Sequence, residues 1–121
     1  MLLDRLLSLE AVLAGSVSAN QLDVHVVYRD WTPEGEPAPP YFERTSTNSA
    51  TAVTILSAPV LNPQREIQSL SIYNADTSTH HIVAIKTVSA TVSSTIVNLT
   101  VSTLQTLHYE RGVGWYITHR D

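Results

Sequence analysis

The sequence predicts an all-β fold, an antiparallel β-sandwich or jelly-roll-like barrel with a short N-terminal α-helix. Apolar and polar side chains alternate along short segments, turn residues separate these segments at a spacing of about ten residues, and no strand–helix–strand rhythm appears. The length of 121 residues suits a single globular unit. We expect an N-terminal helix or arm over residues 1–16 and a β-sandwich domain over residues 17–121, with a proline-rich loop at 31–43.

The first residues carry a leucine pattern that is typical of a helix. Asp4 would lie in the first turn, where a negative charge suits the helix dipole, and Gly15 is a natural stop. A helix of about three turns is marginal alone, so its aliphatic stripe should pack against the chain's own sheets or against another subunit. Both alternatives remain open. The residues that follow the helical i, i+3, i+4, i+7 spacing are Leu2, Leu3, Leu6, Leu7, Leu9, Val12 and Leu13.

The rest of the chain is expected to form strands. Leu22, Val24, Val26 and Tyr28 alternate with more polar residues, which is the period of two that a half-buried strand requires. The later segments are dense in Ile, Val and Thr, which fit a pleated surface. Turns are expected at 74–78 and 111–114, because Asn, Asp, Ser and Gly gather there. Further strands are expected at 50–56, 66–73, 80–88, 91–101, 104–109 and 114–118.

Four of the six prolines fall between residues 33 and 40. Prolines at this density remove backbone donors and favour extended conformations, so this segment is expected to be a surface loop or arm outside the sheets. Trp31, Tyr41 and Phe42 flank or lie within it. Aromatic side chains on such an arm either anchor in a partner's pocket or fold back over the end of the domain. We favour the partner contact.

Composition excludes several classes of function. The net charge of −4 is spread without long runs, and seven basic residues make no basic patch, so we expect no nucleic-acid partner. The chain has no cysteine, and therefore neither disulfides nor thiolate metal sites. Asp4, Arg5 and Glu10 interrupt the early apolar run, which argues against a signal peptide. We expect a soluble, unprocessed chain with no membrane partner.

No group of residues amounts to a catalytic or metal site. His80 and His81 are adjacent on an expected strand, so their rings should point to opposite faces, and we expect surface or edge histidines. His25, His108 and His119 could join one of them only through folding that the spacing does not predict. The sequence also lacks a Gly-x-Ser-x-Gly elbow and a glycine-rich phosphate loop. We therefore expect no enzyme activity and no cofactor.

The segment Asn74-Ala-Asp76 offers two interpretations. Its side-chain oxygens could serve a calcium ion, although calcium sites usually gather more carboxylates than this region holds. A turn in which these side chains bond to their own backbone is the favoured interpretation.

Two segments in the second half resemble a family of small tailed-bacteriophage virion proteins. The first is Gln64-Arg65-Glu-Ile-Gln-Ser-Leu-Ser-Ile-Tyr73-Asn74-Ala-Asp76-Thr77, and the second is Leu104-Gln-Thr-Leu-His-Tyr109-Glu-Arg-Gly112-Val-Gly114-Trp115. In that family an Arg-led strand ends in a Tyr-Asn-x-Asp-Thr turn, and a Gly-Trp pair closes the domain. The resemblance covers about residues 50 to 118. The chain departs from the family at 101–104, where a glycine-containing turn is common.

The resemblance implies a virion structural protein, with a capsid decoration (cement) protein favoured over a neck or tail adaptor or a fibre-attachment protein. It implies a homotrimer bound to the major capsid protein or other virion proteins, made in the host cytoplasm and located on the capsid surface. A carbohydrate-binding module is the alternative of another class, since β-sandwiches often carry sugars on aromatic platforms. Trp115 and Tyr116 should point to opposite faces, so only one could serve a given platform. The residues expected to contact partners are Leu3, Leu6, Leu7, Leu13, Trp31, Tyr41 and Phe42.

Overall fold

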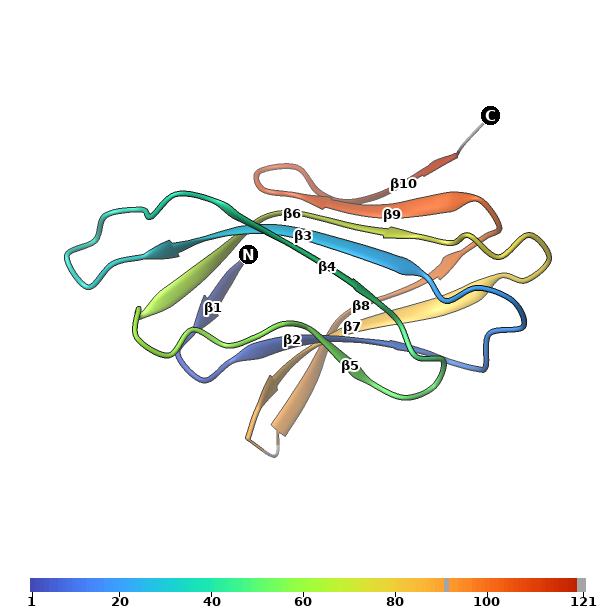
Figure 1. Ribbon diagram of the computed structural model, residues 1–121, viewed down its shortest axis with the longest axis horizontal. Helices are drawn as coiled ribbons and strands as arrows, with labels where there is room; N and C mark the ends of the chain where they lie inside the picture. Colours follow the sequence, from blue (N-terminus) through green and yellow to red (C-terminus); the bar gives the residue numbers. More distant parts are fainter. Residues whose placement is uncertain (91, 120–121) are drawn as a thin grey trace.

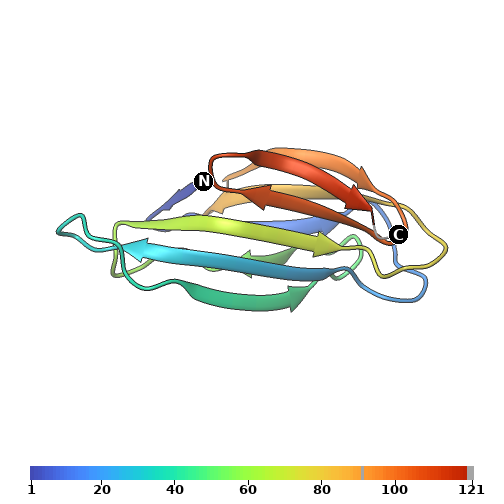
Figure 2. The same ribbon diagram turned by 90° about the horizontal axis from the view of Figure 1, so that it is seen from above.

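The chain folds into two antiparallel β-sheets that lie face to face (Figures 1 and 2). The computed structural model describes residues 1–90 and 92–119, and within these ranges the chain forms strands and no helix. The prediction of an all-β fold is confirmed. Both sheets are open rather than joined into a closed barrel within the described residues.

The larger sheet has six strands in the order β10-β9-β6-β3-β4, with β1 pairing to the first half of β6. Strand β6 is central, because it pairs with β3 on one side and with β1 and then β9 on the other. The strands of this sheet are β1 (Leu2–Asp4), β3 (Asp23–Trp31), β4 (Tyr41–Ser46), β6 (Gln64–Tyr73), β9 (Gln105–Glu110) and β10 (Gly114–His119).

The smaller sheet has four strands in the order β5-β2-β7-β8. Its last two strands form a long hairpin, and the end of β7 and the start of β8 lie beyond the rest of the sheet in Figure 1. Thr91, the first residue of the strand expected at 91–101, lies outside the described residues. The strands of this sheet are β2 (Ser8–Leu13), β5 (Val53–Leu56), β7 (His81–Ser89) and β8 (Val92–Val101).

The core lies between the sheets and follows the predicted alternation. Along β3, Val24 and Val26 are fully buried while Asp23, His25 and Val27 are half-buried, because successive side chains point to opposite faces. Each sheet contributes one face to this single cluster. The largest fully buried side chains are Leu3, Leu9, Leu13, Leu22, Val24, Ile55, Leu56, Ile67, Leu70, Ile72, Ile85 and Leu107.

The predicted N-terminal helix is wrong. The segment instead forms β1 in the larger sheet and β2 in the smaller one, joined by a turn in which the Leu7 amide donates to the Asp4 carbonyl at 3.0 Å. Leu3, Leu9 and Leu13 are buried, all at odd positions, so a period of two fits the buried set. The dense leucines satisfy both periods, and pairing with β5, β6 and β7 overrides their helix propensity.

The expected proline-rich loop at 31–43 is too long at both ends. Trp31 is the last residue of β3, and Tyr41 begins β4, which pairs with β3 along its length. The prolines end at Pro40, so they do not remove any donor from β4. The segment between the strands, 32–40, is a hairpin loop that extends beyond the sheets in Figures 1 and 2.

Candidate functional site

The leucines predicted to contact partners differ in how far the fold buries them. Leu3 and Leu13 are 0% and 2% exposed within the chain's own core, so they have no surface to offer a partner. Leu7 is partly buried against that core. Leu6 is the exception, because its side chain is 67% exposed. The leucine stripe was expected to pack either on the chain's own sheets or on another subunit. The chain's own sheets cover Leu3, Leu7 and Leu13, and Leu6 is left exposed.

Leu6 lies in the β1–β2 turn next to two other exposed aliphatic side chains. Its amide donates to the carbonyl of Pro59 at 3.3 Å, and Arg5 reaches the carbonyl of Leu61, which joins this turn to the β5–β6 loop. Val60 and Leu61 in that loop are 68% and 86% exposed. Both loops lie at the lower left in Figure 1. We call Leu6, Val60 and Leu61 the end patch.

The backbone at Leu6 is strained as well as exposed. Its φ of +69° lies in the left-handed region, which a leucine enters at a cost of about 1–2 kcal/mol. A sequence under selection for stability alone would place Gly or Asn at such a turn, and a polar residue where the side chain meets water. The fold gains little from a leucine at this position.

A part-buried ion pair positions the β5–β6 loop against the end of β3. Arg65 Nε lies 2.7 Å from Asp30 Oδ1, and both side chains are 13% exposed. The same guanidinium donates to the carbonyl of Ser57, and Asn62 donates to the second oxygen of Asp30. Hydrogen bonding from Arg65 holds the pKa of Asp30 below its usual range. The loop that carries Val60 and Leu61 is therefore anchored on both sides of its tip.

The three aromatic candidates do not gather in one place. Trp31 is half-buried opposite Pro37 at the base of the 32–40 loop. Tyr41 and Phe42 are 56% and 59% exposed on β4, and as neighbours on a strand they point to opposite faces. Tyr41 packs near Tyr28, with ring centroids 5.8 Å apart. Phe42 lies on the outer face of the six-stranded sheet.

A groove with a mixed polar and apolar lining, which sequence reasoning missed, runs along β6 on this outer face. Ser69 and Ser71 are short, whereas the neighbouring strands carry taller side chains in register with them: Ser71 pairs with His25 on one side and with His108 on the other. The depression has a volume of about 320 Å³. We call it the serine groove; its lining residues are His25, Val27, Ser69, Leu70, Ser71, His108, Tyr109 and Glu110.

The wall formed by β9 is held by neighbours on β10. The rings of His108 and Tyr116 stack at 4.8 Å with an angle of 13° between them. The Tyr116 hydroxyl donates to Glu110 Oε1 at 2.6 Å, and this hydrogen bond raises the pKa of Tyr116. His108 Nε2 lies 2.8 Å from the hydroxyl of Thr118. These contacts fix the ring of His108 and one oxygen of Glu110 before any ligand arrives.

The opposite wall is held in a similar way by β3 and β4. His25 packs beside Phe42, with ring centroids 5.4 Å apart, and its Nε2 is 3.9 Å from Asp23. Arg44 binds the same carboxylate at 3.0 Å, so the positive charge of Arg44 is already paired.

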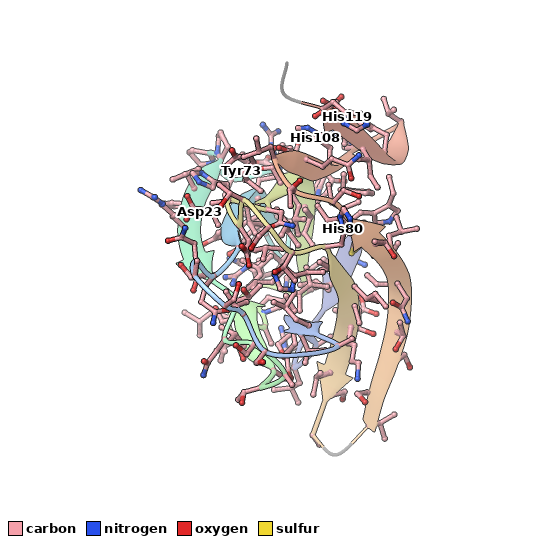
Figure 3. All side chains as sticks on the ribbon, turned by 90° about the vertical axis from the view of Figure 1, so that its right-hand side faces the viewer. Asp23, Tyr73, His80, His108 and His119 are labelled. Carbon is pink, nitrogen blue, oxygen red and sulfur yellow. The ribbon has the colours of Figure 1, made fainter. Side chains whose placement is uncertain are left out.

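Neither the groove nor the histidines form a metal or nucleophile site within residues 1–90 and 92–119. No three His, Asp or Glu side chains there are placed to hold a metal ion. The hydrogen bond of His108 points to Thr118, away from Ser71, so this ring is not arranged as a base for that serine. Figure 3 shows His108 and His119 together at the β9–β10 edge and His80 lower, beside the four-stranded sheet.

His81 is buried, so the expectation of two surface histidines is wrong for it and holds only for His80. His81 is 4% exposed, and its Nε2 lies 3.2 Å from Asp76 Oδ2. Asp76 is itself fully buried and also accepts from Ser18 and from the amide of Ser78. The predicted Asx-type turn is confirmed, because Asn74 Oδ1 accepts from the Asp76 amide at 3.0 Å.

Acid should destabilise the fold through Asp76 and Asp30. Hydrogen bonding, from His81 and Arg65 respectively, lowers both pKa values. A carboxyl whose folded-state pKa is lowered stabilises the fold above its ordinary pKa of about 4, and this contribution is lost as the pH falls through the lowered value. We expect the urea midpoint to fall steeply below about pH 4. Asp76→Asn should flatten this fall, whereas Glu34→Gln in the exposed 32–40 loop should leave it unchanged.

Comparison with known proteins gave no relative: no family model, no curated protein and no solved structure matches the chain. No helix in the described part of the chain could cross a membrane.

Proposed function

We propose that this chain is a non-enzymatic structural protein of a tailed-bacteriophage virion, built as a β-sandwich and docked on a neighbouring virion protein through the end patch. The observation that carries the proposal is the exposure of Leu6, Val60 and Leu61 on two adjoining loops, one of them strained. The fold leaves these large aliphatic side chains exposed, so covering them with a partner lowers the free energy.

The surroundings of the end patch support docking by a rigid element. Arg65 and Asp30 tie the β5–β6 loop to the body, so little conformational entropy is lost when a partner covers it. The 32–40 loop projects from the same end of the molecule in Figure 1 and adds a second, proline-stiffened surface.

Among virion roles, a capsid decoration protein is favoured over a neck or tail adaptor because of the resemblance carried by residues 64–77 and 104–115. A decoration protein that binds only the assembled shell stabilises the shell by mass action. The partner would then be the major capsid protein and the location the capsid surface.

The proposal is tested on purified particles of the phage whose genome encodes this sequence. Quantitative mass spectrometry should find the chain in high copy number, and antibody labelling should decorate the capsid. Low copy number with labelling at one vertex would assign the chain to the neck or tail instead. Absence of the chain from particles would contradict the virion role altogether.

Self-association is proposed to use the free edge of β8. In the described residues β8 pairs only with β7, and its ten residues hold neither a charge nor a proline. Natural edge strands are usually protected by such residues. The protection present is a bulge at Ile96, which leaves the run 97–101 straight. The resemblance favours a trimer, in which this run would meet a different edge of the next copy.

Lysine substitutions on β8 should dissociate the oligomer into monomers. Asn98 and Thr100 are exposed, so the double variant Asn98→Lys/Thr100→Lys should fold normally but repel an incoming strand. Native mass spectrometry should show oligomers for the parent chain and monomers for the variant. Thr77→Lys, at an exposed position in the β6–β7 loop, is the control and should keep the oligomer. A parent chain that is monomeric at high concentration would contradict this proposal.

A further inference from the structure

We propose that the serine groove binds a neutral saccharide, in a site where two serine hydroxyls lie between two imidazole rings and beside a carboxylate. This binding function is additional to the proposed virion role and does not depend on it. The groove lies on the outer face of the six-stranded sheet, whereas the end patch lies on the loops at one end of the molecule.

The dimensions of the groove suit a small ring. Its walls stand on β3 and β9, the two strands that flank β6, so they are about two strand spacings, or roughly 10 Å, apart. The volume of about 320 Å³ lies at the small end of the range of about 300–1,000 Å³ for ligand sites, which fits one or two sugar rings.

The wall of the groove on β9 presents a flat ring face. The 4.8 Å between the rings of His108 and Tyr116 equals the usual distance between neighbouring strands, and the rings are nearly parallel. They therefore stand side by side with their faces directed across the strands. Tyr116 stacks on His108 from the β10 side, and Ser71 is the register partner of His108 on the β6 side, so the ring face turned away from Tyr116 is the one available to a ligand. Flat ring faces of this kind pack against the C–H faces of sugars.

The polar atoms match sugar hydroxyls. Serine hydroxyls both donate and accept, as sugar hydroxyls do, and Ser69 and Ser71 place two of them on the floor. Glu110 accepts from Tyr116 with Oε1, which leaves Oε2 as an acceptor at the rim. His108 uses Nε2 toward Thr118, which leaves Nδ1.

Charge and polarity disfavour other ligands. The carboxylate of Glu110 at the rim repels anions, and the guanidinium of Arg44 is already paired with Asp23. In the described residues no cluster could hold a metal ion. A purely apolar ligand would leave the hydroxyls of Ser69 and Ser71 and the carboxylate of Glu110 without partners, although Val27 offers an aliphatic contact. A neutral polyhydroxylated ring is the class that remains.

The test is an NMR titration of the full chain with neutral mono- and disaccharides: glucose, galactose, N-acetylglucosamine and their common disaccharides. At least one should shift the amide signals of Val27, Ser69, Ser71 and Glu110 in a saturable way. Ser71→Tyr fills the groove from a position that tolerates a large β-former, so it should weaken binding at least tenfold. Thr54→Tyr introduces the same side chain at an exposed position on β5 and should leave the affinity unchanged.

The proposal is overturned if none of these sugars shifts the groove signals, or if Ser71→Tyr binds as well as the parent while remaining folded. Titration with inorganic phosphate is the third arm, and saturable shifts with phosphate alone would also overturn it. Since none of these variants touches Leu6, Val60 or Leu61, incorporation into particles reports on the virion role separately.

Discussion

Leu61→Asp is expected to abolish incorporation of the protein into phage particles while leaving the fold intact. Leu61 is 86% exposed, so aspartate there is fully solvated in the free protein and should shift the unfolding midpoint little. In the docked state the same carboxylate would be buried in an apolar contact. Loss of a central aliphatic anchor costs about 2 kcal/mol or more, which is about 30-fold in affinity, and the buried charge adds to this. Complementation of a phage that lacks the gene, followed by quantitative mass spectrometry of particles, measures the loss.

Leu6→Gly separates docking from folding more sharply. Glycine relieves the strain at the φ of +69° but increases the entropy of the unfolded chain, so the free energy of unfolding should stay within about 1 kcal/mol of the parent value. Incorporation should nevertheless fall, because the side chain is lost.

The chain offers a matched control for Leu6→Gly. Leu104 has a φ of +60° in the β8–β9 turn, so Leu104→Gly makes the same substitution at the same backbone conformation away from the end patch. It should incorporate normally. Equal incorporation of all three variants and the parent would contradict the docking role of the end patch.

Asn74→Ala should cause the largest loss of stability. The Asn74 side chain donates to the carbonyls of Thr79 and Val101, each at 3.0 Å, and accepts from the Asp76 amide. Alanine would leave these buried groups without partners, and each such group costs about 1–3 kcal/mol. The expected loss is therefore at least about 3 kcal/mol, a large share of the about 5–15 kcal/mol that holds a typical domain folded. Urea denaturation followed by tryptophan fluorescence measures it.

The control for Asn74→Ala uses the same pair of residue types. Asn98 is exposed on β8, so Asn98→Ala should change the free energy of unfolding by no more than about 0.5 kcal/mol. Similar losses for the two variants would mean that the Asn74 hydrogen bonds contribute little. The backbone of Asn74 is hydrogen-bonded to Gln105 and Leu104 in and beside the β8–β9 turn. A displacement of Asn74 in the alanine variant would therefore also loosen that turn.

Local pattern predicts most of this fold. The strands after residue 60 lie within two residues of the expected ranges, because alternation and turn residues mark them clearly. The N-terminal segment fails because its leucines fit two periods at once, and only the pairing with distant strands selects one of them. The sequence does not predict strand β4, because the expected proline-rich loop runs to residue 43 although its last proline is Pro40.

The sites depend on register, which local pattern does not contain. His25, Ser71 and His108 could each be assigned to the outer face by parity, yet their alignment in one row depends on pairing between segments far apart in sequence. The burial of His81 did leave a signal, because it shares parity with Val83 and Ile85 on a strand whose inward positions are otherwise apolar.

The assignment of β1 and β2 to separate sheets has a consequence for synthesis. These leucine-rich strands leave the ribosome before their partners, because β1 pairs with β6 and β2 pairs with β5 and β7, all of them later in the sequence. The nascent chain must carry exposed leucines until β6 and β7 have been translated. Such non-local pairing slows folding and favours aggregation of unfinished chains. Chaperones that bind extended apolar segments should therefore engage residues 2–13 during translation.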